Sequence, residues 1–210
     1  MKSPLNSPAL LSCLAVSVLL TACSDPSENV HKSDASGPVA ATAPTTATGR
    51  EFALQPDSRI GFVGSKVTGS HVGGFTNFTG SLLVADGKVV GSPEFKIDMN
   101  STWSDNDRLT GHLKNADFFD VPNHPTTTFT ITTIEPGATN STVTGNLDLR
   151  GVTKSISFPA AIQVGADAVT VKAEFAINRK DFNILYTGRA DDLIRDNVVI
   201  QLDLKAAPKG

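Results

Sequence analysis

The chain has 210 residues, of which 40% are hydrophobic, 19% charged and 6% aromatic, and its formal net charge is −3. This composition is typical of one soluble domain with a short extension, and it excludes a collagen-like chain, disorder throughout and a polytopic membrane protein. The 18 Lys and Arg residues stand against 21 Asp and Glu residues without forming a basic cluster, so the sequence predicts no nucleic-acid partner.

The first 22 residues have the features of a bacterial lipoprotein signal peptide. Lys2 precedes an apolar stretch over residues 9–20, which is short for a membrane span but typical of a signal-peptide apolar region. The stretch ends in Leu-Thr-Ala-Cys, which resembles a lipobox and implies that Cys23 is acylated. A plain secretory signal with an incidental thiol is the alternative. We expect a lipid-anchored protein on the periplasmic face of the envelope, with the outer membrane favoured because Ser24 follows the cysteine.

The segment after the cysteine predicts a disordered linker. Residues 24–49 are rich in Ser, Thr, Ala and Pro and show no periodicity. As a flexible coil, such a linker would hold a domain roughly 25–30 Å from the membrane. The predicted organisation is therefore a signal peptide (1–22), a lipidated cysteine with its linker (23–50) and one domain (51–210). That domain contains no cysteine, because Cys13 and Cys23 both precede it.

Alternation of apolar and polar residues dominates the domain. It is clear over residues 94–100, 156–164, 169–178 and 198–205, and a period of two indicates strands with one apolar face. Glycine-containing turns separate these segments, as at 85–88 and 150–151. The pattern predicts an antiparallel meander of about eight strands, which closes into a barrel because closure removes exposed edges. One short helix is expected over 106–115, capped by Asp105 or Asn106.

Four segments, in order, resemble the YceI-like family of lipid- or polyisoprenoid-binding domains. They are Gly-Phe-Thr-Asn-Phe-Thr-Gly at 74–80, His-Leu-Lys-Asn-Ala-Asp-Phe-Phe-Asp at 112–120, Gly-Asn-Leu-Asp-Leu-Arg-Gly-Val-Thr-Lys at 145–154 and Ile-Asn-Arg-Lys-Asp-Phe at 177–182. The chain departs from the family at Leu109-Thr110, where many members carry Arg-Asp, and at Asn183, where Gly is common.

The resemblance implies a lipocalin-like, eight-stranded up-and-down barrel that holds a long apolar lipid such as a polyisoprenoid, an isoprenoid quinone or a fatty-acid amide. It implies neither catalytic residues nor a cofactor. His112 and Arg179 are the expected contacts to a lipid head group. The expected cavity lining is formed by apolar residues of the alternating strands and motifs, namely Phe62, Phe75, Phe78, Phe95, Ile97, Met99, Phe129, Leu147, Phe158, Phe175, Ile177 and Phe182.

Other readings of the sequence remain open at this point. A period of two describes a packed core as well as a cavity wall, so an interaction module with a self-filled barrel is the main alternative. A lipid-directed enzyme would require polar groups that converge at the mouth of the barrel, but no Gly-x-Ser-x-Gly motif is present. The histidines have no metal-ligand spacing, and the segment from Asp105 lacks the Gly and Glu of a calcium loop, so no metal is predicted.

Overall fold

The structure is a computed structural model that describes residues 25–40 and 48–209. Strands dominate it, together with one α-helix, α1 (Asp107–Leu113), and two 3-10 helices, η1 (Met99–Ser101) and η2 (Arg179–Phe182). The strands are β1 (Lys32–Ser33), β2 (Arg50–Leu54), β3 (Arg59–Lys66), β4 (Gly69–Phe75), β5 (Phe78–Ala85), β6 (Lys88–Val90), β7 (Glu94–Asp98), β8 (Thr102–Ser104), β9 (Thr126–Glu135), β10 (Ser141–Leu149), β11 (Val152–Val164), β12 (Val169–Asn178), β13 (Gly188–Arg189), β14 (Asp192–Leu193) and β15 (Asn197–Pro208).

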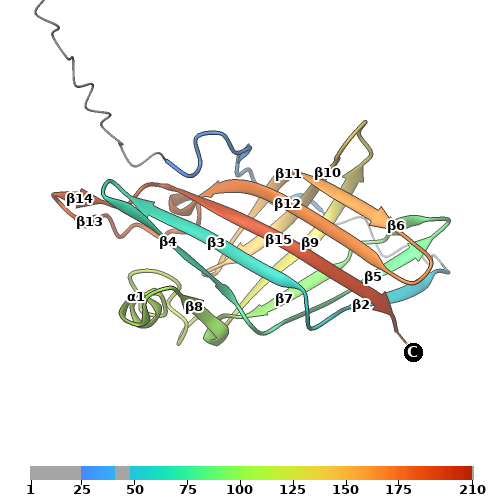
Figure 1. Cartoon of the computed structure of the whole chain (residues 1–210), viewed down its shortest axis with the longest axis horizontal. Coiled ribbons are helices and arrows are strands. Elements are labelled where there is room, and N and C mark those ends of the chain that lie inside the picture. Colours follow the sequence, from blue (N-terminus) through green and yellow to red (C-terminus); the bar gives the residue numbers. More distant parts are fainter. Residues whose placement is uncertain (1–24, 41–47, 210) are drawn as a thin grey trace, which may run out of the picture.

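Eight antiparallel strands close into a barrel, as the alternation predicts (Figure 1). β2 and β3 pair with successive parts of β15, and β5 pairs with β2 while β4 pairs with β3. β8 pairs with β4, and β7 pairs with β5 and leads to β9, which is followed by β10, β11 and β12 in a meander. Pairing of β12 with β15 over ten residues completes the ring. Closure leaves the inward side chains of every strand facing one common interior.

The turns have the backbone geometry that their residues allow. Asp86 and Gly87 both have positive φ, of 51° and 70°, between β5 and β6. Arg150 and Gly151, with φ of 53° and 71°, make the same kind of turn between β10 and β11. Two consecutive positive φ values match the right-handed twist of the flanking strands, which explains the tight hairpins at these places.

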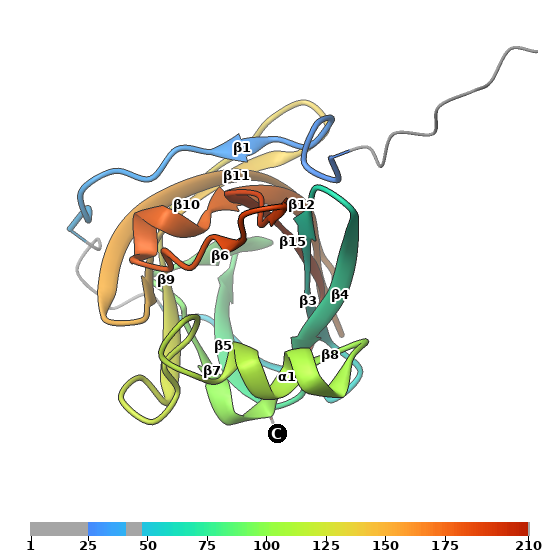
Figure 2. The same cartoon turned by 90° about the vertical axis from the view of Figure 1, so that its left-hand side faces the viewer.

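The barrel has two different ends. At one end, the α1 end, lie α1, η2, the β13–β14 hairpin and the β3–β4 turn (Figures 1 and 2). Helix α1 begins as predicted, because the Asn106 side chain accepts a hydrogen bond from the Leu109 amide at 3.0 Å. The opposite end, the β6 end, is filled by a buried cluster of Phe52, Leu82, Val169 and Ala206. An interior cavity therefore has its access at the α1 end.

The described N-terminal segment lies against the barrel, which differs from the free linker that its composition predicts. β11 and β12 pair only over Ala161–Val164 and Val169–Lys172, and they separate toward the α1 end. Residues 25–40, here called the strap, fill this opening (Figure 2). The Ala176 amide donates to the His31 carbonyl at 2.7 Å, and Ser36 and Ser155 exchange backbone hydrogen bonds. The composition of the strap does not predict this ordered conformation, because the backbone hydrogen-bond partners come from an opening in the barrel wall.

Several predictions fall on residues that the structure does not describe. The signal peptide and Cys23, with its acyl group, lie outside the described residues, so the lipid anchor stays a prediction. Within the described part of the chain, no helix is long and apolar enough to cross a membrane.

Candidate lipid-binding cavity

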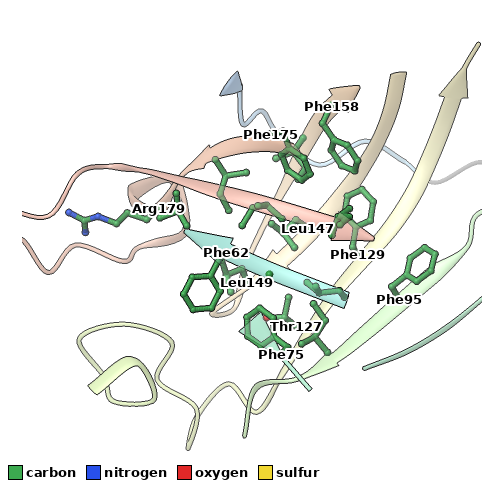
Figure 3. Close-up of a pocket in the computed structure, with 18 of the residues that line it drawn as sticks. Phe62, Phe75, Phe95, Thr127, Phe129, Leu147, Leu149, Phe158, Phe175 and Arg179 are labelled. Atoms are coloured by element: carbon green, nitrogen blue, oxygen red, sulfur yellow. The ribbon is translucent and has the colours of Figure 1, made fainter. Parts of the chain in front are cut away.

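The barrel encloses a cavity of about 430 Å³ (Figure 3), within the range of about 300–1,000 Å³ that is usual for ligand pockets. Its walls are almost entirely apolar. Side chains from every long strand and from α1 contribute, and the polar side chains in the wall are Ser65, Lys66, His71, Thr127 and Arg179. The hydroxyl of Thr127 is buried without a hydrogen-bond partner among the described residues. A barrel filled by its own side chains does not match this interior.

Two groups of phenylalanine rings shape the cavity. Near the α1 end, Phe62, Phe75 and Phe119 lie with ring centroids 5.8–6.3 Å apart. Deeper in the barrel, the Phe158 and Phe175 rings stack at 4.0 Å and nearly parallel, and Phe129 lies 5.7 Å from Phe158. Rings in such offset or tilted pairs hold one another in fixed orientations, so they form a preformed apolar lining.

Glycines on neighbouring strands leave space for two of the phenylalanine rings in the cavity wall. Gly73 lies opposite Phe62, and Gly80 lies opposite Phe95 across the sheet. A Cβ atom on Gly80 would stand 2.3 Å from the Phe95 ring, and one on Gly73 would stand 2.4 Å from the Phe62 ring. Both rings therefore lie directly against glycine backbone on the inner face of the wall.

The structure brings most of the predicted lining together. Ten of the twelve residues face the cavity, namely Phe62, Phe75, Phe95, Ile97, Met99, Phe129, Leu147, Phe158, Phe175 and Ile177. Phe78 is half-buried at the start of β5 and does not belong to the wall, because the chain bends at Thr76 and Asn77 just before it. Phe182 is completely buried in η2, where the 3-10 turn replaces the two-residue alternation. These two predictions are wrong for the cavity as it is formed here.

The predicted lining did not include the side chains at the α1 end. Leu109, Leu113, Phe118 and Phe119 come from α1 and the loop after it, and they cover this end of the barrel. The four-residue spacing of Leu109 and Leu113 marks one face of a helix, and this signal could have placed them inside. The inward residues of β15, Val198, Ile200, Leu202 and Leu204, also line the cavity and followed directly from their alternation.

The cavity reaches the surface beside Lys66 and His71. Both residues line it, yet their side chains keep 37% and 38% of their area exposed. Lys66 forms an ion pair with Asp192, and His71 Nδ1 lies 2.8 Å from the Asp105 carboxylate. The hydrogen bond with Lys66 lowers the pKa of Asp192, and the one with His71 lowers the pKa of Asp105. The Lys66–Asp192 ion pair and the His71–Asp105 contact thus flank the mouth of the cavity. His71 lies on strand β4, which contains three glycines.

Neither predicted head-group contact has a free polar group directed into the cavity. The Arg179 guanidinium is buried and donates to the carbonyl oxygens of Ile184 at 2.6 Å and Arg195 at 3.1 Å, and it pairs with Asp196. In Figure 3 it points away from the phenylalanine rings. Burial lowers the pKa of this guanidinium, while Asp196 opposes the shift. Arg179 therefore holds the loop after η2 in place, and the head-group prediction for it is not supported.

His112 also has a structural setting. Its Nε2 atom lies 2.7 Å from the Asp117 carboxylate, and its ring contacts Phe118 and Tyr186 edge-on at 5.0 and 5.1 Å. It is absent from the cavity wall. Its contacts tie α1 to the loop that covers the α1 end, which places it beside the mouth rather than against a bound chain. Among the described residues, no group of three or more His, Cys, Asp or Glu side chains could hold a metal ion.

A closed antiparallel barrel with an apolar interior and one accessible end defines a lipocalin-like binding fold. The chain belongs to the YceI-like family, because the family described as "YceI-like domain" matches residues 52–206. The strap precedes this match.

Sequence relatives agree with this assignment. A UPF0312 protein of Pectobacterium carotovorum subsp. carotovorum is 32% identical over 120 residues, which cover 53% of this chain and 62% of that protein. Protein YceI of Escherichia coli O17:K52:H18 is 31% identical over 120 residues, with the same two coverages. The chain thus spans less than two thirds of the length of these relatives.

Solved structures share the fold. BcnA of Burkholderia cenocepacia matches with a TM-score of 0.64 and 23% identity. The match covers 71% of this chain and 96% of the BcnA chain. A structure described as a polyisoprenoid binding domain from Saccharophagus degradans has a TM-score of 0.63 and 20% identity, with 77% and 100% covered. At these identities the likeness establishes the fold.

Proposed function

We propose that this protein binds a long apolar lipid in its barrel and carries or sequesters that lipid in the bacterial cell envelope, without chemical turnover. The observation that carries the proposal is the apolar cavity of about 430 Å³ inside a closed barrel. The similarity to a structure described as a polyisoprenoid binding domain supports an isoprenoid chain as the ligand. An isoprenoid quinone and a fatty-acid amide belong to the same apolar class.

The energetics of such a site favour a chain molecule. Burial of each methylene contributes about 0.8 kcal/mol, so one five-carbon unit gives up to about 4 kcal/mol before the ordering of the chain is subtracted. A few units are enough for tight binding. Because a bilayer competes for the same ligand, a role in delivery or sequestration suits the protein better than simple solubilisation.

A binding role also fits the polar groups near the mouth. His112 and Arg179, which an enzyme hypothesis would use, already have protein partners that fix the surrounding loops. We further propose that acylated Cys23 anchors the protein on the periplasmic face of the envelope, with the outer membrane favoured. The supporting observation for the anchor is the lipobox-like sequence itself.

Native mass spectrometry of the protein extracted gently from membranes tests the proposal. We expect one co-purified lipid per chain, identified by its mass after release. Ile200→Trp places a larger side chain into the cavity and should abolish retention, whereas Gln201→Trp, one residue along β15 on the outer face, should retain the lipid. Circular dichroism checks that both variants fold. An empty wild-type barrel, or equal retention by the two variants, contradicts the proposal.

A further inference from the structure

Exposed apolar side chains gather around the mouth of the cavity. Of the seven large hydrophobic side chains that are exposed among the described residues, six lie at or beside the α1 end and one, Val39, lies elsewhere on the wall. The six, here called the mouth rim, are Val67, Val72, Trp103, Leu185, Tyr186 and Leu193. Exposed apolar side chains that gather at one end of a protein indicate an interaction surface.

The mouth rim lies next to residues that line the opening. Val72 follows His71 along β4, and Leu193 precedes Ile194, and both His71 and Ile194 line the cavity. Because neighbours along a strand point to opposite faces, Val72 and Leu193 lie on the outer side of the wall. The Leu193 carbonyl also accepts a hydrogen bond from the Val67 amide at 3.2 Å, which brings the β13–β14 hairpin beside the β3–β4 turn. The mouth rim therefore borders the opening from the outside.

The strap begins at this same end. Asp25, the first described residue, lies 3.4 Å from Arg195, whose amide donates to the Ser65 carbonyl at the end of β3. Asp25 also accepts hydrogen bonds from the amide and hydroxyl of Ser27, which is completely buried. Only Ser24 separates Asp25 from Cys23, and two residue steps span at most about 7 Å. An acyl group on Cys23 would thus enter the membrane close to the mouth.

Charges of both signs lie near the opening. Lys66 pairs with Asp192, Lys180 pairs with Asp196, and the His71 ring lies against the Asp105 carboxylate. The exposed Arg189 and Asp191 of the β13–β14 hairpin also have opposite signs. This mixture gives no one-sided field to attract an anionic partner, so contact with a neutral surface relies on the apolar side chains.

From these observations we propose that the mouth rim docks on the lipid bilayer, so that the cavity opens directly into the membrane that holds its ligand. This inference rests on the proposed function and on acylation of Cys23. In this arrangement the barrel does not move freely on a flexible linker. Its mouth is held against the lipid bilayer. The occupant is the apolar zone of a bilayer, and Leu185, exposed by 59%, and Leu193, exposed by 49%, are the side chains that enter it.

Depth-dependent quenching tests the orientation. The full-length protein is isolated from membranes with its anchor and reconstituted in phosphatidylcholine vesicles, and a bimane probe is attached to an introduced cysteine. With Leu193→Cys, brominated phosphatidylcholine should remove most of the fluorescence. With Asp167→Cys, in the exposed turn between β11 and β12 at the β6 end, fluorescence should be unchanged. A rim probe that stays unquenched overturns the proposal, as does an intact mass that shows Cys23 without acyl chains.

Ligand transfer provides the second measurement. Leu193→Asp should slow lipid transfer between the barrel and neutral vesicles by about ten-fold, a factor that corresponds to about 1.4 kcal/mol. Val39→Asp makes the same change at the exposed apolar residue away from the mouth and should leave the rate unaltered. Equal rates for the two variants overturn the docking inference alone. A barrel that carries no lipid in any variant fails the proposed function instead, so the two failures are distinguishable.

Discussion

At the scale of single residues, two buried threonines differ in whether their hydroxyl groups form a hydrogen bond. The Thr127 hydroxyl lacks a partner among the described residues, whereas the Thr102 hydroxyl donates to the Met99 carbonyl at 2.7 Å. Both residues are almost fully buried. An unsatisfied buried polar group costs the free energy of its lost hydration, whereas a satisfied one contributes to stability.

Replacement of each threonine by valine should therefore change stability in opposite directions. We expect Thr127→Val to raise the free energy of unfolding by about 1 kcal/mol and Thr102→Val to lower it by a similar amount. Urea unfolding followed by circular dichroism gives both values. A loss of stability in Thr127→Val would show that this hydroxyl has a partner in the folded protein, such as a bound ligand or a water molecule.

The sequence predicts residue positions better than residue partners. Alternation places Phe129, Phe158 and Phe175 on the inner face correctly, because the side-chain period of a strand does not depend on its neighbours. It fails at Phe182, where η2 interrupts the period. Arg179 donates to the carbonyl groups of residues 184 and 195. Sequence patterns do not predict which backbone carbonyl accepts from a side chain, so this structural role could not be foreseen.

At the scale of elements, the β13–β14 hairpin is tied to the mouth by one carboxylate. Asp192 pairs with Lys66 and also accepts hydrogen bonds from the amide and hydroxyl of Thr68. These contacts lower the pKa of Asp192 below its ordinary value of 3.8. A carboxylate with a lowered pKa in the folded state stabilises the fold at pH values above its unfolded pKa, and this contribution disappears as the pH falls through the folded pKa.

Asp192→Asn should therefore destabilise the protein at neutral pH and have a diminishing effect in acid. The measurement is the difference in urea midpoint between the wild type and the variant, followed from pH 7 to pH 3. We expect this difference to be largest at pH 7 and to shrink progressively below about pH 4, where the unfolded chain begins to bind a proton that the folded carboxylate with its lowered pKa still excludes. A difference that is independent of pH would show that the ion pair does not hold the hairpin.

The strap is an element that composition does not predict. Its sequence is rich in small polar residues and β1 contains only two residues, so neither periodicity nor propensity identifies it. The strands with clear alternation, such as β12 and β15, are in contrast predicted by periodicity and turn residues. The difference arises because the strap is ordered by an opening between β11 and β12, which exists only in the folded barrel.

One substitution separates the role of the strap backbone from that of its side chains. Ser36→Pro removes the amide that donates to the Ser155 carbonyl, whereas Ser36→Ala keeps it. We expect Ser36→Pro to speed hydrogen exchange at the Ser155 and Ala176 amides, both of which donate to the strap. Ser36→Ala should leave their protection unchanged. Unaltered exchange in the proline variant would mean that the strap is not held by these bonds.

At the scale of the whole molecule, an empty cavity and a filled one should differ in stability. A ligand that binds only the folded state, at a hundred times its dissociation constant, adds about 2.7 kcal/mol. For a domain of the size spanned by residues 51–210, this corresponds to an increase in Tm of about 5–10 °C. Thermal unfolding of the lipid-loaded protein, compared with protein refolded after solvent extraction, measures the shift. Identical Tm values would indicate that extraction removed nothing from the interior.

The strap also has a consequence for the order in which the molecule forms. Ser33 contacts Ser157, which is separated from it by 124 positions in the chain. Contacts over such long separations are slow to form, because the intervening chain has to be ordered first. The strap is therefore expected to dock last, after β11 and β12 have formed. We expect a nearly complete barrel with an opening between these two strands to precede the native state, and the strap to close that opening.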